Sequence, residues 1–242
     1  MNDNIEFDFE DIEFADNPEP RCPVVLLLDR SESMRGEPIA QLNEGLQKFQ
    51  AEITQDPIAS SRVEVAIVTF GPVKVEDIKD GTDLDLRGDA DSAFITVDNF
   101  TPPILTPFDE TPMGEAVEVA LELLRSRKEI YKRNGIDYFR PWLFLITDGY
   151  PTDRENFPRA WELVQEEVER KGVTFFGVGV ERADMQVLAQ FSNEREPIKL
   201  RGLDFGDLFT WLSASLSGIA ESRPGEQIAL PSVEWGEIDT SV

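Results

Sequence analysis

The chain has 242 residues, and its 48 acidic and 23 basic side chains give a formal net charge of −25. It contains no histidine and one cysteine, which excludes Ser-His-Asp and Cys-His catalysis, His-bearing zinc sites and internal disulfides. The acidic excess argues against binding to nucleic acid or anionic membranes, whereas a hydrophobic content of 40% is enough for a packed core.

The two ends of the chain differ in composition from the part between them. Residues 1–21 form an acidic N-terminal arm in which Ile5, Phe7 and Phe9 alternate with acids, a pattern that suits either an edge strand or a disordered arm. Residues 221–242 contain Pro and Gly without a helical period, so we expect a loosely held C-terminal tail. The N-terminus carries no signal-peptide pattern and no apolar run approaches the roughly 20 residues of a membrane span, so we expect a cytoplasmic protein.

Between these ends, predicted strands and helices alternate. Short aliphatic runs predict strands that are buried on both faces, and apolar residues three and four apart predict helices. The predicted strands are 23–28, 63–70, 95–100, 142–147, 173–180 and 198–200, with 73–75 as a hairpin edge. The predicted helices are 39–53, 113–132, 158–170, 184–191 and 207–219. This order predicts one α/β domain, residues 22–220, with a doubly wound, mainly parallel central sheet, one antiparallel edge strand and helices on both faces. Residues 76–92, rich in Asp, are expected to form a surface excursion.

Side chains that carry oxygen follow two of the predicted strands. Asp29, Ser31 and Ser33 alternate after the first strand, and Asp148 follows the strand that ends one residue earlier. Thr111 lies just before the long helix that starts at residue 113, and we expect it to cap that helix, with the following proline in the first turn. Because ligands of doubly wound sheets bind beyond the carboxyl ends of the strands, these three loops are expected to converge.

A divalent cation would stabilise these residues in one place. Two uncompensated carboxylates about 4 Å apart repel by about 4 kcal/mol at an effective dielectric constant near 20, and a cation between them turns that repulsion into attraction. Carboxylates and hydroxyls suit Mg²⁺, Mn²⁺ or Ca²⁺, and they suit zinc poorly. We therefore expect Asp29, Ser31, Ser33, Thr111 and Asp148 to hold Mg²⁺, with Mn²⁺ or Ca²⁺ as alternatives. Taken singly, each residue is also typical of a turn or a helix cap.

The three motifs together resemble those of a known family. Asp29-x-Ser31-x-Ser33 after an aliphatic strand, Thr111-Pro112-Met113-Gly114 at a helix start and Asp148-Gly149 after a strand resemble the von Willebrand factor A (VWA) domain. That domain carries a metal-ion-dependent adhesion site (MIDAS) built from a D-x-S-x-S loop, a separate Thr and a separate Asp. The resemblance covers roughly residues 22–220 and implies the same Rossmann-like α/β fold.

For the five residues, the resemblance implies separate roles at the metal. Ser31 and Ser33 are implied to bind the ion directly through their hydroxyls, and Thr111 to do so in at least one state. Asp29 and Asp148 are implied to bind directly or through water. One position on the ion stays open for an Asp or Glu that a protein partner supplies.

Two stretches, 27–38 and 111–116, look most like the bacterial cytosolic VWA proteins of the tellurite-resistance (TerY-like) type. This resemblance implies a metal-dependent protein–protein interaction module without enzymatic activity, in a bacterial stress-response or defence system. Its candidate partners are a PP2C-type protein phosphatase and a Ser/Thr protein kinase.

Alternative functions stay open at this point. Asp29 after an apolar strand is also typical of the nucleophile of haloacid-dehalogenase-type phosphohydrolases, but the acid that this chemistry needs two residues later is Ser31. A metal-independent scaffold on the same fold is the second alternative. Gly177-Val178-Gly179 matches a dinucleotide-binding loop only in part, because Arg182 stands at the third glycine position. An acidic residue from either end of the chain is a further candidate for the open metal position.

Overall fold

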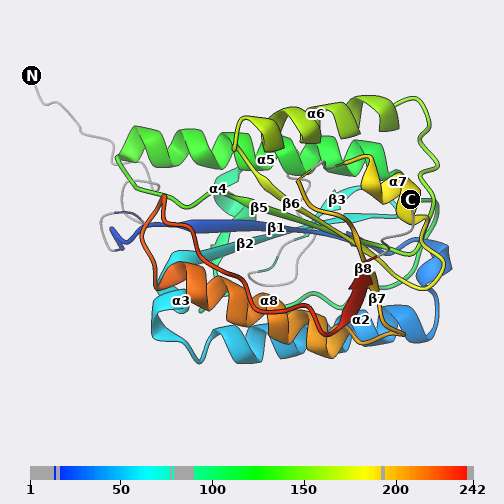
Figure 1. Ribbon diagram of the computed structural model, residues 1–242, viewed down its shortest axis with the longest axis horizontal. Coiled ribbons are helices and arrows are strands. Elements are labelled where there is room, and N and C mark those ends of the chain that lie inside the picture. Colours follow the sequence, from blue (N-terminus) through cyan, green and yellow to red (C-terminus); the bar gives the residue numbers. More distant parts are fainter. Residues whose placement is uncertain (1–13, 15–16, 77, 79–89, 192–193, 239–242) are drawn as a thin grey trace, which may run out of the picture.

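The computed structural model describes residues 14, 17–76, 78, 90–191 and 194–238 (Figure 1). The alternating segment at residues 5–9 and most of the acidic excursion at 76–92 lie outside these residues. Within the described chain, one sheet forms the central layer, with helices above and below it (Figure 1). The position of the candidate site depends on where the strands of this sheet end.

The central sheet has the strand order β3-β2-β1-β5-β6-β7-β8, and β4 pairs with β2. Its strands are β1 (Cys22–Asp29), β2 (Val63–Phe70), β3 (Lys74–Val75), β4 (Ile95–Thr96), β5 (Trp142–Thr147), β6 (Thr174–Gly179), β7 (Ile198–Leu200) and β8 (Gly236–Ile238). The pairs between β2, β1, β5, β6 and β7 are parallel, whereas β3, β4 and β8 pair antiparallel with their neighbours. The predicted doubly wound, mainly parallel sheet is confirmed, and β3 is the predicted antiparallel edge.

Two helical layers cover this sheet (Figure 1). One face carries α2 (Glu37–Ile53), α3 (Pro57–Arg62) and α8 (Phe205–Ala220), and the other carries α4 (Ala90–Ala93), α5 (Met113–Asn134), α6 (Phe157–Glu169) and α7 (Met185–Ala189). Each layer has its own apolar core, because the central strands bury side chains on both faces. No helix in the described part of the chain is long and apolar enough to cross a membrane.

The register of the central strands brings their carboxyl ends to one edge. Leu28 in β1 aligns with Thr69 in β2 and with Ile146 in β5, so these three strands end within a residue of one another. Thr147, the last residue of β5, aligns with Gly179 of β6. The loops that leave these strands therefore start side by side, as the predicted convergence of the motifs requires.

Some short elements of the fold differ from the expectations. The strand predicted at 95–100 is only the two-residue β4. The Val97 N–H still donates to the Val63 carbonyl of β2, and residues 97–100 then form a turn. The short helix α3 was not predicted, although it has a local cause: the Asp56 carboxylate accepts the N–H groups of Ile58 at 2.9 Å and Ala59 at 3.2 Å.

The segment after α8 is held more firmly than the expected loose tail. Its last described residues form β8, which pairs with β7. Trp235 is 2% exposed and its ring meets Trp211 of α8 edge-on, with the ring centres 5.7 Å apart. The Trp211 indole N–H donates to the carbonyl of Pro231 at 2.9 Å. These contacts extend the apolar core past the end of α8, because the large Trp235 side chain packs among apolar residues there.

We expect Trp235→Leu to lower the free energy of unfolding by about 1–2 kcal/mol, because it removes buried aromatic area and the contact with Trp211. Urea unfolding measures this change. Ile104→Ala is the matched control, since Ile104 is 82% exposed and its truncation is expected to change stability by less than about 0.5 kcal/mol. An equally small effect of Trp235→Leu would mean that this segment adds nothing to the core.

At the amino edge, opposite the converging loops, the sheet contains a buried charged cluster. Glu64 at the start of β2 accepts hydrogen bonds from Arg21 Nε at 2.8 Å, from Arg127 Nε and Nη2 at 2.9 Å each, and from the Tyr131 hydroxyl. The ring of Phe14 lies 5.4 Å from the Arg21 guanidinium and 5.3 Å from that of Arg127. Burial and Glu64 raise the pKa of Tyr131 well above its usual value, so this residue stays a hydrogen-bond donor. We call these residues the amino-edge cluster.

Candidate metal centre

The loop after β1 turns the two serines toward each other. Asp29 ends β1, and its Oδ1 accepts the backbone N–H of Ser31 at 2.8 Å. A single turn of 3₁₀-helix, η1 (Glu32–Met34), follows at once. The hydroxyl oxygens of Ser31 and Ser33 consequently lie 2.9 Å apart. This compact turn replaces the strand geometry that would have pointed alternate residues to opposite faces of the sheet.

The loop after β5 brings the second carboxylate to this turn. The Ser33 hydroxyl donates to Asp148 Oδ1 at 2.7 Å. The Thr147 hydroxyl donates to Asp29 Oδ2 at 2.5 Å, across the two neighbouring strands. A continuous set of hydrogen bonds thus joins Thr147, Asp29, Ser31, Ser33 and Asp148. Four of the five predicted ligands are linked in this way.

Thr111 reaches the same place from a third loop. Its backbone N–H donates to the Thr152 hydroxyl at 3.1 Å, and its carbonyl accepts the Thr152 N–H at 2.9 Å, so the two loops are tied together. A β-carbon at Gly149 would lie 3.2 Å from Thr111 Oγ1 and 3.3 Å from Asp29 Oδ2. Thr111 and Asp29 therefore both face Gly149, and a side chain at that position would crowd them. The structure brings all five predicted residues together.

The expected capping role of Thr111 is wrong. Helix α5 starts at Met113 with Pro112 at the cap position, and no side chain at the cap makes a hydrogen bond. Instead, the Asp153 carboxylate accepts the N–H groups of Gly114 at 3.2 Å and Glu115 at 2.8 Å. A negative side chain suits this end of a helix because the free N–H groups are partly positive there. The Thr111 hydroxyl therefore does not cap the helix.

We expect Asp153→Ala to lower the free energy of unfolding by about 1 kcal/mol, because two N–H groups of α5 lose their acceptor. Thermal unfolding followed by circular dichroism measures the loss. Glu155→Ala, an exposed acid in the same loop, serves as the control for the change in charge. Equal stability of the two variants would refute the capping role.

Burial sets the electrostatics of the two carboxylates. Asp29 is fully buried, and burial raises its pKa to about 6 against the opposing hydrogen bonds from Ser31 and Thr147; Asp148 adds to the rise. Burial also raises the pKa of Asp148, while the hydrogen bond from Ser33 lowers it. Neither carboxylate forms a salt bridge with a Lys or Arg among the residues that the structure describes. A bound cation would supply the missing positive charge.

The oxygen positions fit a small divalent cation. In an octahedral shell with metal–oxygen distances of about 2.1 Å, adjacent oxygens lie about 3.0 Å apart. The Ser31–Ser33 and Ser33–Asp148 oxygen pairs lie 2.9 and 2.7 Å apart. The described residues contain no group of three or more His, Cys, Asp and Glu side chains that suits a metal. A cation at this edge therefore depends on the hydroxyls as much as on the two carboxylates.

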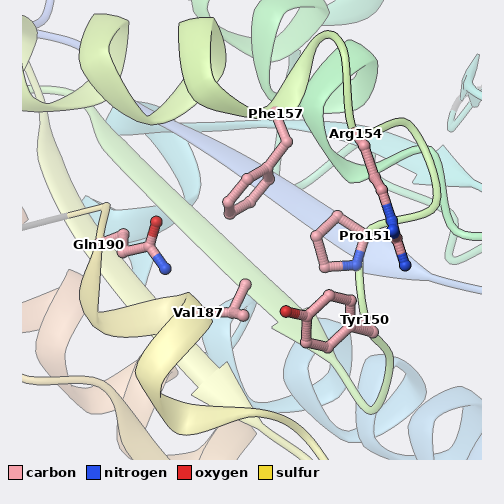
Figure 2. A pocket seen from close by; sticks show the side chains of 6 residues that line it. All are labelled: Tyr150, Pro151, Arg154, Phe157, Val187 and Gln190. Carbon is pink, nitrogen blue, oxygen red and sulfur yellow. The ribbon is translucent and has the colours of Figure 1, made fainter.

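The rim of this site carries exposed aromatic residues. Tyr150, two residues after Asp148, is 56% exposed and lines a pocket of about 370 Å³ together with Arg154, Phe157 of α6 and Val187 of α7 (Figure 2). On the other side, Phe108 is 58% exposed, and its loop is fixed to the loop after β1 by backbone hydrogen bonds. The site is thus flanked by surfaces that suit contact with another protein.

Sequence analysis missed Thr147 and Asp153. Thr147 is the last residue of a predicted strand, but its bond to Asp29 depends on β1 and β5 being neighbours, which the sequence does not reveal. Asp153 is one of 48 acids in the chain, and no local spacing distinguishes it. Both residues act through partners that lie far away in the sequence.

One comparison with known proteins identifies the family, and another finds similar folds. The sequence profile of the von Willebrand factor type A domain matches residues 24–202. No curated protein sequence matches the chain. Solved structures with a similar fold include the pilus adhesin SpaC from Lactobacillus rhamnosus GG, which is 12% identical with a TM-score of 0.56 over 84% of this chain and 31% of the adhesin.

Two further structures show the same kind of likeness. The human COPII-coat protein Sec24c is 11% identical, with a TM-score of 0.53 over 84% of this chain and 33% of that protein. Proximal thread matrix protein 1 from the mussel byssus is 15% identical, with a TM-score of 0.49 over 84% of this chain and 47% of that protein. The chain therefore spans less than half the length of these proteins. At such identities the likeness to the pilus adhesin and to Sec24c concerns the fold alone.

Proposed function

The chain belongs to the von Willebrand factor type A family, and from this premise we propose that it is a protein-interaction module that works through a divalent cation. The cation is Mg²⁺, held as in a MIDAS by Asp29, Ser31, Ser33, Thr111 and Asp148. The bound ion supplies a positive centre that attracts an Asp or Glu of a protein partner. VWA domains are protein-interaction modules, so the cation is the specific part of this proposal.

The convergence of three loops carries the proposal. Side-chain oxygens from the loops after β1, before α5 and after β5 meet around Gly149 and Ser33. Two buried carboxylates lie there without a salt bridge among the described residues, and neutral hydroxyls complete the set. Neutral ligands leave positive charge on the ion, which favours binding of an outside carboxylate.

The surroundings of Asp29 support a role in binding rather than in catalysis. Both of its carboxylate oxygens already accept hydrogen bonds, one from Ser31 and one from Thr147, and the side chain is fully buried. A phosphohydrolase nucleophile needs an oxygen that faces the substrate and an acid nearby, whereas the residue two positions later is Ser31. We therefore propose a non-enzymatic protein.

The cellular setting is proposed from the motifs alone. The likeness of residues 27–38 and 111–116 to TerY-like proteins supports a bacterial cytoplasmic protein in a stress-response or defence system. It also supports a PP2C-type phosphatase and a Ser/Thr kinase as partners. The exposed Tyr150 and Phe108 beside the metal centre are suited to contact such a partner while its carboxylate binds the ion.

Calorimetric titration of the chain with MgCl₂ and MnCl₂ tests the proposal. We expect saturable binding of one ion per chain and a higher melting temperature at saturating metal, because a ligand that binds only the folded state stabilises it. Titration without a saturable heat, together with an unchanged melting temperature, would contradict the proposal and favour a metal-independent scaffold.

The partner is tested by affinity purification with the chain as bait, in Mg²⁺ and in EDTA. A direct partner is expected in Mg²⁺ and not in EDTA, and not with Asp148→Ala as bait in either buffer. A partner that binds equally in all these conditions would show recognition without the cation. Phosphate release from a generic ester that Asp29→Asn abolishes would instead identify an enzyme.

A further inference from the structure

A broad groove with basic walls opens near the amino edge, away from the metal centre. It has a volume of about 970 Å³ and is lined by the end of α5, the loop before β5, the end of α6 and the segment after α8. Six of its charged lining residues are basic and one, Glu226, is acidic, in a chain with a net charge of −25. The basic residues are Lys128, Lys132, Arg140, Arg170, Lys171 and Arg195. We call this feature the basic groove.

Acids next to the groove pair with several of these bases. Glu129 pairs with Lys132, Glu194 with Arg140, and Glu167 with Lys128 and Arg170. Among the described residues that line the groove, basic side chains outnumber acidic ones six to one. The side chains of Lys132 and Glu129 are both more than half exposed, and such a pair contributes little stability. Lys132 is therefore able to exchange one carboxylate for another at little cost.

Apolar side chains also line the basic groove. Trp142 and Ile219 line it from the sheet and from α8, and Ile228 and Leu230 line it from the segment after α8. Tyr138 lines it as well. A groove lined by both apolar and cationic side chains fits an extended segment in which acidic and apolar side chains alternate, since each kind finds its counterpart.

Residues 5–13 of this chain have that composition. They contain five acids, four large apolar residues and no base, in the order Ile-Glu-Phe-Asp-Phe-Glu-Asp-Ile-Glu. The described chain begins next to the groove: the Phe14 ring lies 6.0 Å from that of Tyr131, which lies 5.4 Å from the ring of Tyr138. Nine residues reach about 30 Å when extended, which is enough to follow the groove.

We propose that the basic groove is a binding site for an acidic–apolar peptide segment and that residues 5–13 of the same chain occupy it. Phe14 is held at the amino edge by the amino-edge cluster, so these residues start beside the groove and one strand length from the metal centre. Charge complementarity and proximity act together, because a tethered segment has a high local concentration. The site is separate from the cation and does not depend on the proposed metal function.

Zero-length cross-linking of the full chain with a carbodiimide tests the occupant directly. This reagent joins a lysine amine to a nearby carboxylate with loss of water. We expect cross-links from Lys128, Lys132 or Lys171 to the acids at positions 6–13, and none from Lys48 or Lys199 on other surfaces. Mixing ¹⁵N-labelled and unlabelled chains distinguishes links within one chain from links between two. Absence of the first kind, or links only between chains, overturns the proposed occupant.

A labelled peptide of residues 1–13 measures the affinity of the basic groove by fluorescence anisotropy. Its receptor is the full chain with Glu6→Gln, Asp8→Asn, Glu10→Gln and Asp11→Asn, which frees the groove from its own acids. We expect this chain to bind the peptide at least tenfold more tightly than the wild type, whose own segment competes. Equal affinities would overturn the self-occupied groove, and another protein's acidic segment would then be the candidate.

Charge reversal in that receptor locates the binding surface. Lys132→Glu with Lys171→Glu is expected to weaken peptide binding at least tenfold, since both side chains are exposed and neither holds the fold together. Lys48→Glu with Lys199→Glu makes the same change in net charge elsewhere and is expected to change affinity by less than twofold. Equal losses in the two pairs would show a general charge effect and overturn the groove as the site. Unchanged Mg²⁺ binding in the receptor and in both of its charge-reversal variants separates this result from the metal proposal.

Discussion

Replacement of both Ser31 and Ser33 by alanine is expected to weaken Mg²⁺ binding about 100-fold. The two hydroxyls lie 2.9 Å apart and one of them donates to Asp148, so they form the side of the site that faces the second carboxylate. Each interaction of a hydroxyl with a charged group contributes about 1.5 kcal/mol, and the loss of two corresponds to about 3 kcal/mol. Calorimetric titration with MgCl₂ and MnCl₂ measures the change in affinity.

The matched control removes two hydroxyls elsewhere. Ser217→Ala with Ser232→Ala alters α8 and the segment after it, and we expect its Mg²⁺ affinity to stay within twofold of the wild type. Ser31→Ala with Ser33→Ala should keep the far-ultraviolet circular dichroism spectrum of the wild type, because the backbone N–H groups of Ser31 and Met34 keep their hydrogen bonds within the turn. Unchanged cation binding in this variant would remove the serines from the metal centre.

The buried core strands could be predicted because a strand that is buried on both faces has a nearly continuous apolar sequence. The aliphatic runs at 63–70 and 142–147 became β2 and β5 with the predicted bounds, since every side chain in them is enclosed. The three-residue β8 has no such apolar run. It forms because Trp235 finds a place against Trp211 and because β7 offers a free edge, and neither cause lies within the segment itself.

The candidate site shows the same division between local and distant causes. Asp29, Ser31 and Ser33 could be found because one turn presents all three, and Asp148 because it directly follows a buried strand. The partners that orient these residues come from elsewhere: Thr147 reaches Asp29 across the sheet, and Asp153 caps α5 and so leaves Thr111 free of that task. Such pairings need the strand order and register, which the sequence pattern does not contain.

The largest loss of stability is expected at the other end of the sheet, from Glu64→Ala. This carboxylate is fully buried and is the shared acceptor of Arg21, Arg127 and Tyr131. Its removal takes this shared anion away from two buried guanidinium groups, and breaking a buried ion pair in this way costs about 3–5 kcal/mol. Urea unfolding followed by tryptophan fluorescence is expected to show a lower midpoint with an unchanged slope.

Glu129→Ala separates this effect from the loss of an ordinary surface pair. Glu129 also pairs with a base, Lys132, but both side chains are largely exposed, so its removal is expected to cost less than about 0.5 kcal/mol. Glu64 lies at the start of β2 and the metal centre lies beyond the ends of the strands. Glu64→Ala, measured without urea and well below its melting temperature, should therefore keep wild-type Mg²⁺ affinity. The double serine variant should instead lose Mg²⁺ affinity and keep its free energy of unfolding. Loss of both properties in either variant would mean that the two edges of the sheet are coupled, since independent sites add their effects.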